Sequence, residues 1–160
     1  MKRKNINLAP VTPYNRCLKR LLQFANSRGI DVNTNSRTFS YIEDDHLINL
    51  SNKCAGQYKY ICYFLHELGH ATQPDSVFHK LKYKTHTINK LIILEQEYTA
   101  WVYGYRIAKR LNIDKYIKDI YIKEWSSAWH SYMMYLNRTN KTHIKYLATH
   151  GYGPKGHDPI

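Results

Sequence analysis

The sequence predicts a mostly helical domain of the α+β class, and three observations carry that prediction. Apolar residues recur at helical spacing in several long stretches, two short segments alternate between apolar and polar residues, and one helical stretch carries paired histidines. The 160 residues, 43% of them hydrophobic, can bury one core. We therefore expect a single domain over residues 1–136 and a polar, loosely ordered tail over residues 137–160.

The first part of the chain should form a helix followed by a β-hairpin. A helix is expected over about residues 12–27, because Thr12 is a favourable N-cap and Pro13 suits the first helical position. The segments 38–43 and 47–51 alternate between apolar and polar residues on either side of a polar turn. This pattern is typical of two short strands that pair with each other.

Three longer helices should follow, over about residues 56–72, 87–111 and 114–136. Each has an apolar stripe at helical spacing that would bury one face. The last stripe is strongly aromatic, and we expect it to be core rather than a binding surface. The stripes are, in order, Ile61, Phe64, Leu65 and Leu68; Leu91, Leu94, Tyr98, Trp101, Tyr105 and Ala108; and Ile117, Ile120, Tyr121, Trp125, Ala128, Trp129, Tyr132 and Met133.

The helix over residues 56–72 contains the run His66-Glu67-Leu68-Gly69-His70. Histidines four residues apart lie on one face of a helix, so both imidazoles can bind one Zn2+. Glu67 lies close enough to take a proton from a metal-bound water, and a zinc peptidase needs these three groups at this spacing. Coincidence is the alternative, because the chain has 9 histidines. Gly69 suggests that another backbone or a substrate approaches closely, since glycine costs a helix about 1 kcal/mol relative to alanine.

A third ligand must come from another part of the chain. The extended pattern H-E-x-x-H-x-x-G-x-x-H is excluded, because Gln73 and Ser76 stand where it needs glycine and histidine. Cys62 lies one turn before His66, but one ion cannot span the three turns from Cys62 to His70. We interpret Cys62 as a packing residue. Residues expected in exposed loops, in a turn or in the tail are not favoured either, and these are Asp75, His79, His86, His150 and His157.

Glu95 and Glu97 remain as candidates, both in the helix over residues 87–111. Ala100 and Gly104 follow Glu97 by three and seven residues, so all three lie on the same face of the helix. That strip of small residues would let this helix approach the H-E-x-x-H helix closely. Glu95 lies among bulkier neighbours. We favour Glu97 as the third ligand and keep Glu95 as the alternative.

Two stretches resemble the motifs of the ImmA/IrrE-like metallopeptidases of bacteria, phages and mobile elements. They are Phe64-Leu-His-Glu-Leu-Gly-His-Ala-Thr72 and Leu94-Glu-Gln-Glu-Tyr-Thr-Ala-Trp-Val-Tyr-Gly104. That family has an H-E-x-x-H helix and then a glutamate in an E-x-x-A context, here Glu97 to Ala100. The resemblance covers roughly residues 13–111.

The resemblance implies a zincin-like domain in which His66, His70 and Glu97 bind Zn2+ and Glu67 is the catalytic base. It implies a small sheet beside the catalytic helix, and the edge of that sheet could hold an extended peptide by strand addition. The implied activity is hydrolysis of a peptide bond in a protein substrate, with repressor-like regulators as the suggested class. Candidates for the group that stabilises the oxyanion, none of them favoured, are several tyrosines, His130 and His143.

The chain is strongly basic, with 24 lysines and arginines against 12 acidic residues. Such a charge attracts nucleic acid or acidic proteins, although it is also a common solubilising surface. The alternative function is a nucleic-acid-binding protein of a phage or mobile element with a structural or inactive zinc site. Glu67 favours the enzyme, because a structural site does not need it. Nucleic acid would meet the basic N-terminal helix and its flanks, which carry Lys2, Arg3, Lys4, Arg16, Lys19, Arg20 and Arg28.

Neither a membrane span nor a disulfide is expected. No apolar run reaches the roughly 18 residues that a membrane-spanning helix needs. Cys17, Cys54 and Cys62 form no C-x-x-C pair, and their odd number argues against a disulfide framework. We therefore expect the reducing cytoplasm, which would be that of the host for a phage-encoded chain.

Overall fold

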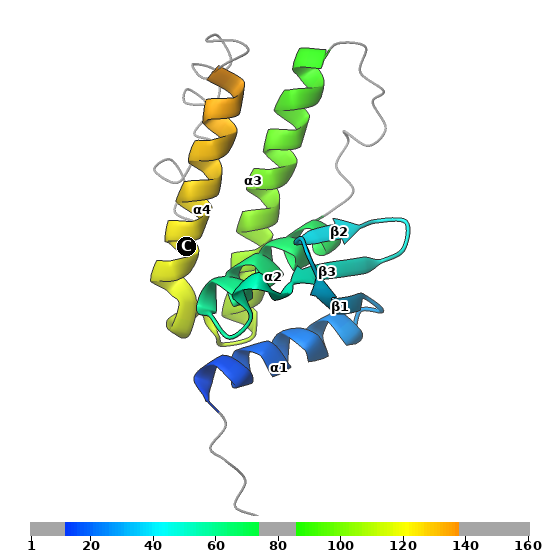
Figure 1. The fold of residues 1–160 in the computed structure, drawn as a ribbon, viewed down its shortest axis with the longest axis vertical. Helices are drawn as coiled ribbons and strands as arrows, with labels where there is room; N and C mark the ends of the chain where they lie inside the picture. The colour runs from blue at the N-terminus through cyan, green and yellow to red at the C-terminus, as the bar shows by residue number, and fades with distance from the viewer. Residues whose placement is uncertain (1–11, 74–85, 138–160) are drawn as a thin grey trace, which may run out of the picture.

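The computed structural model describes residues 12–73 and 86–137 of the chain (Figure 1). Within these ranges, four α-helices accompany one three-stranded sheet, which confirms the mostly helical α+β class. The elements in order are α1 (Pro13–Asn26), β1 (Asp31–Ser36), β2 (Ser40–Ile42), β3 (Leu47–Ser51), the 3-10 helix η1 (Asn52–Cys54), α2 (Tyr58–Thr72), α3 (His86–Arg110) and α4 (Asp114–Asn137).

The first helix and the hairpin lie where the sequence predicted them. Thr12 is the N-cap of α1, and its hydroxyl accepts a hydrogen bond from the backbone N–H of Asn15 at 3.2 Å. Strands β2 and β3 are antiparallel, with Tyr41 opposite Ile48. The helices α2, α3 and α4 also agree with the predicted ranges to within two residues at each end.

Strand β1 was not predicted. It pairs in parallel with β3, so that the strand order is β1-β3-β2 and β2 lies at one edge of the described sheet. Its sequence, Asp-Val-Asn-Thr-Asn-Ser, is polar, and most of its residues are exposed. Backbone pairing with β3 holds β1 in place. The strand lacks the alternation of apolar and polar residues from which a strand can be predicted.

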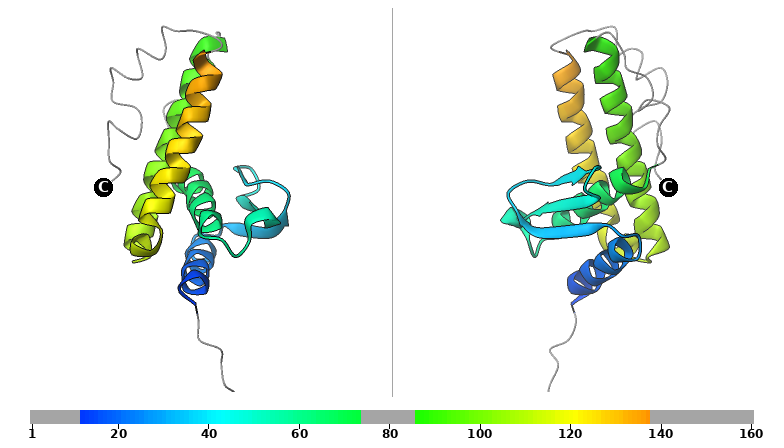
Figure 2. Two further views of the ribbon diagram at one scale, coloured as in Figure 1. Left: turned by 60° about the vertical axis from the view of Figure 1, so that its left-hand side comes forward. Right: turned by 90° about the vertical axis from the view of Figure 1, so that its right-hand side faces the viewer.

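Helix α2 is at the centre of the fold. It contacts the other three helices and the strands β2 and β3. Figure 2 shows it between the sheet on one side and the α3–α4 pair on the other. Burial extends to its polar residues, since His66 and Glu67 are each only 6% exposed. The predicted apolar stripe is fully buried and consists of Ile61, Phe64, Leu65 and Leu68.

Helices α2 and α3 pack backbone against backbone. A Cβ atom on Gly69 would overlap the carbonyl group of Ala100, and one on Gly104 would overlap the carbonyl group of Leu65. The expectation of a close approach at Gly69 is therefore confirmed, and the neighbour is the backbone of α3. The small-residue strip of Ala100 and Gly104 is confirmed as the other half of this contact. Functional groups on the facing sides of the two helices can consequently touch.

Helices α3 and α4 run antiparallel (Figure 1), and the turn between them contains Asn112 at a positive φ of 55°. Arg20 of α1 holds this turn, because its Nη1 donates a hydrogen bond to the backbone oxygen of Leu111 at 2.7 Å. The aromatic stripe of α4 is core, as predicted, with Tyr121 and Trp125 fully buried. Arg20, one of the basic residues for which nucleic-acid binding is predicted, thus also anchors α1 to the α3–α4 turn.

The cysteines Cys17, Cys54 and Cys62 are buried and free, and burial of Cys62 was predicted. Burial raises the pKa of the Cys62 thiol, in keeping with a packing role. None of the helices in residues 12–73 and 86–137 is long and apolar enough to cross a membrane. Asn137 is the last residue of α4, and the rest of the predicted tail lies outside the described residues.

The substitution Gly69→Ala should destabilise the protein even though alanine is the better helix former. Its methyl group has no room beside the Ala100 carbonyl, and overpacking of this kind typically costs about 1–3 kcal/mol. Urea denaturation and amide hydrogen exchange would measure the effect, and exchange should accelerate in both α2 and α3. Gly56→Ala is a comparison of a different kind: its methyl group meets nothing within 4 Å, but its φ of 85° strains any side chain. Its cost should therefore come from the turn before α2 and not from the contact between α2 and α3. Wild-type stability in Gly69→Ala would contradict the backbone contact.

Candidate metal centre

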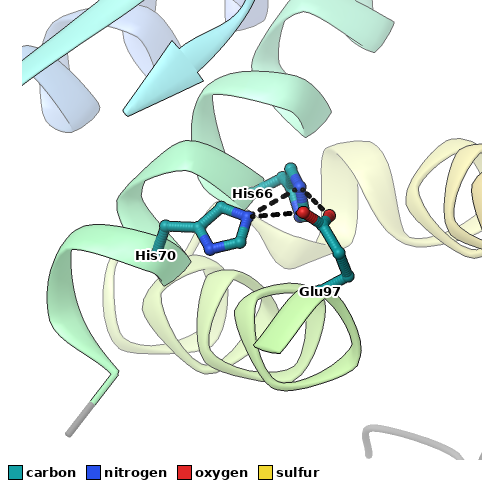
Figure 3. Close-up of side chains that lie close together, drawn as sticks. All are labelled: His66, His70 and Glu97. Atoms are coloured by element: carbon teal, nitrogen blue, oxygen red, sulfur yellow. Dashed lines mark hydrogen bonds and ion pairs between the residues drawn. The ribbon is translucent and has the colours of Figure 1, made fainter. Parts of the chain in front are cut away.

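His66, His70 and Glu97 meet at one point although they come from two helices (Figure 3). The Nε2 atoms of His66 and His70, on α2, lie 3.2 Å apart. Glu97 reaches them from α3, with its Oε2 3.1 Å from Nε2 of His66 and its Oε1 3.6 Å from Nε2 of His70. The structure thus brings Glu97, and not Glu95, to the two histidines.

The cluster fits a small divalent metal ion. Ligands bound tetrahedrally to Zn2+ at about 2.0–2.1 Å are separated from one another by roughly 3.3 Å. The three contacts within the cluster measure 3.2, 3.1 and 3.6 Å. Two imidazole nitrogens and a carboxylate are also a donor set that Zn2+ accepts. The three residues could therefore hold a metal ion, as the sequence predicted.

Burial and charge set the protonation of the three groups. Burial lowers the pKa of His66, which keeps this imidazole neutral with a lone pair to offer. Burial also opposes protonation of His70, but the hydrogen bond and charge of Glu97 outweigh it and raise the pKa of His70. Burial favours the neutral form of Glu97, but hydrogen bonds to both histidines outweigh it and hold the pKa of Glu97 far below its usual range. An ionised carboxylate between two imidazoles attracts a cation.

Glu67 lies beside the cluster without belonging to it. It is buried on α2 and lines the same cleft as the three clustered residues. Burial raises the pKa of Glu67 to about 7, while the charge of His70 and a hydrogen bond with the backbone of Tyr41 act in the opposite direction. A carboxyl group of this basicity can exchange a proton near neutral pH, which a general base must do.

A cleft of about 550 Å³ opens over the cluster. This volume falls within the roughly 300–1,000 Å³ typical of binding sites. Strand β2 and the turn after it form one wall, α2 and α3 contribute the clustered residues, and α4 contributes one tyrosine. Among the residues whose side chains the structure describes, no lysine or arginine lines the cleft. The lining residues are Phe39, Ser40, Tyr41, Glu43, His46, His66, Glu67, His70, Ala71, Gln73, Gln96, Glu97 and Tyr132.

Two aromatic residues outside the cluster contact its members. The hydroxyl of Tyr132, on α4, donates a hydrogen bond to Oε2 of Glu97 at 2.6 Å. The indole of Trp101, on α3, stacks on His66 with ring centroids 4.4 Å apart and planes 29° from parallel. In the sequence both aromatic residues belong to apolar stripes, and neither is predicted to contact the clustered residues. No motif marks either contact, because each depends on how two helices cross.

The remaining candidates do not join the cluster or fall outside the described residues. Glu95 is half-buried on α3, and the fully buried Cys62 packs in the core. His130 is exposed on α4 and does not line the cleft. The side chain of His86 is not among those described. The candidates in the undescribed segments are Asp75, His79, His143, His150 and His157.

In comparisons with known proteins, no family model matches the chain, and no curated protein and no solved structure matches it. The resemblance of the two motifs to the ImmA/IrrE-like metallopeptidases therefore stays a prediction from the sequence.

The purified protein should bind one Zn2+ per chain, and the two glutamates of α3 should differ sharply in their effect on it. Glu97→Ala removes one of the three clustered groups. It should weaken zinc binding by more than about 100-fold, since loss of a partner outside the ligand set already costs about 10–100-fold. Glu95→Ala, the same change two residues away, should leave the affinity nearly unchanged.

Titration with Zn2+ against a chromophoric chelator would measure both affinities, and elemental analysis would give the stoichiometry. Loss of zinc from Glu95→Ala with retention in Glu97→Ala would contradict the assignment of the third ligand.

Proposed function

We propose that this protein is a zinc-dependent peptidase that hydrolyses a peptide bond in a protein substrate. One observation carries the proposal. A cluster of two histidines and a glutamate that could hold a metal ion shares a cleft with the carboxyl group of Glu67. The cleft therefore combines a cation site with a basic group that is not itself part of the cation site.

The number and type of donors favour a catalytic zinc site over a structural one. Structural zinc sites usually have four protein ligands, whereas catalytic sites have three and keep one position open. In residues 12–73 and 86–137, only His66, His70 and Glu97 form such a group. Zn2+ bound there would supply Lewis acidity toward a water molecule and a peptide carbonyl.

Glu67 is suited to move the proton in this reaction. Burial raises its pKa to about 7, so its carboxylate is a stronger base than an exposed glutamate. In the proposed reaction, Glu67 takes the proton of the attacking water and passes it to the leaving amine. The substitution of this one carboxylate by an amide would remove the proton acceptor and leave the clustered residues in place.

The edge strand β2 offers a place for an extended peptide. It pairs with β3 on one side, and three of the residues that line the cleft, Phe39, Ser40 and Tyr41, lie on it or just before it. Main-chain hydrogen bonds to such an edge bind a peptide with little regard to its sequence. The hydrogen bond between the backbone of Tyr41 and Glu67 brings this strand next to the proposed base. Repressor-like regulators remain the substrate class that the resemblance suggests.

The alternative is a basic nucleic-acid-binding protein whose zinc site is structural or inactive. The net charge of +12 favours it, and Arg16 and Lys19 on α1 are exposed. The presence of Glu67 argues against this alternative. Burial of a carboxyl group has a free-energy cost, and a purely structural zinc site has no need for such a group. Nucleic-acid binding that depends on Arg16 and Lys19 is compatible with either function.

The substitution Glu67→Gln should keep the bound zinc and the fold but abolish most hydrolysis. A general base typically contributes about 10²–10⁴-fold in rate, which any working assay would resolve. Quantitative proteomics in a native host would supply the substrate, since proteins that the wild type removes should persist with Glu67→Gln. Glu95→Gln is a matched control on the neighbouring helix and should behave as the wild type.

A wild-type phenotype for Glu67→Gln in the native host would reject peptide hydrolysis as the function. If nucleic-acid binding by the same variant then fell steeply with salt and was lost in Arg16→Gln/Lys19→Gln, the binding function would take its place.

A further inference from the structure

Helix α4 contacts the cluster of His66, His70 and Glu97, although none of these three residues lies on it. The hydroxyl of Tyr132 donates a hydrogen bond of 2.6 Å to Oε2 of Glu97. This oxygen is also the one that lies 3.1 Å from Nε2 of His66. The same tyrosine lines the cleft. Tyr132 therefore stands where the carboxylate, the cleft and the last described helix meet.

The hydrogen bond addresses a specific difficulty of this site. Glu97 reaches the histidines from a different helix, and its side chain has three rotatable bonds that must be fixed for its oxygens to face the two imidazoles. The histidines lie on one helix face and are oriented by the helix itself. A donor that comes from a third helix, α4, adds a restriction that neither α2 nor α3 supplies.

Two further hydrogen bonds connect α4 to the two helices that carry the clustered residues. Tyr121 donates to the backbone oxygen of Trp101, at 2.6 Å, and Trp101 in turn stacks on His66. Glu124 accepts a hydrogen bond of 2.9 Å from the hydroxyl of Tyr63 on α2. Tyr132 differs from both, because its partner is one of the clustered side chains.

We propose that Tyr132 is a positioning residue for the metal: its hydroxyl orients the Glu97 carboxylate toward His66 and His70, so that α4 completes a site whose ligands lie on α2 and α3. Partners that orient metal ligands in this way typically contribute 10–100-fold in affinity or activity. The inference rests on metal binding by the cluster, which the proposed function shares, and is independent of peptide hydrolysis.

The variant Tyr132→Phe tests the inference, because it removes the hydroxyl and keeps the ring. We expect the dissociation constant for Zn2+, measured by chelator competition, to rise by about 10–100-fold. The absorption spectrum of the Co2+-substituted protein should also change, because the carboxylate ligand is held less firmly. Melting of the metal-free protein should differ little from the wild type.

Tyr63→Phe is the matched control. It removes a tyrosine–glutamate hydrogen bond between the same helix α4 and a neighbouring helix, but Glu124 is not in the cluster. Its zinc affinity and Co2+ spectrum should be those of the wild type. A loss of affinity in both variants would indicate a general effect of loosening α4 and would overturn the inference.

A double-mutant cycle checks that Tyr132 acts through Glu97. In the Glu97→Ala background, Tyr132→Phe should cause no further loss of zinc affinity, since the hydroxyl has no carboxylate to orient. An additional loss of the same size would overturn the proposed route, as would unchanged affinity of the single variant Tyr132→Phe.

The outcomes separate this inference from the proposed function. Zinc binding that depends on Tyr132 without any hydrolysis would reject the peptidase and support the positioning role. If hydrolysis requires Glu67 but Tyr132→Phe leaves the zinc affinity unchanged, the peptidase function is supported and the positioning role of Tyr132 is rejected. Absence of zinc binding in the wild type would overturn both.

Discussion

The contact between the backbones of α2 and α3 is the constraint on which the site depends. Gly69 faces Ala100, and Gly104 faces Leu65, with no space for a Cβ atom at either glycine. Because no side chain separates the helices at these points, a glutamate on α3 can reach the imidazoles on α2. A larger residue at either glycine would separate the helices and lengthen the contacts within the cluster. The two glycines therefore belong to the arrangement that brings the three candidate metal ligands together.

The polar residues of α2 are otherwise difficult to explain. His66 and Glu67 are each 6% exposed on a helix whose other central residues are apolar, and burial of ionisable groups has a high free-energy cost unless partners compensate it. His66 and His70 find such a partner in Glu97, and the raised pKa of Glu67 shows that its burial is only partly compensated. Strongly shifted ionisable groups in a cleft are typical of functional sites, and buried Glu67 fits that pattern.

The sequence predicted the long elements well because their apolar stripes are set by helical spacing, as the buried Ile61 and Leu65 illustrate. It also predicted the pairing of the histidines and, through Ala100 and Gly104, the choice of Glu97. Strand β1 was not predicted because its polar residues are held by backbone pairing with β3 and by side-chain hydrogen bonds such as that from Asn33 to Asn49, neither of which leaves an apolar pattern. The role of Tyr132 escaped prediction for a different reason. An aromatic stripe predicts burial, but whether one hydroxyl on it meets a carboxylate depends on the crossing of α3 and α4.

The most direct test of this account is a crystal structure of the protein reconstituted with Zn2+, with anomalous scattering recorded on both sides of the zinc absorption edge. We predict one anomalous peak per chain, within bonding distance of Nε2 of His66, Nε2 of His70 and a carboxylate oxygen of Glu97, with the carboxyl group of Glu67 facing it across the cleft. A zinc peak bound elsewhere, or no peak at this cluster after reconstitution at neutral pH, would contradict the account.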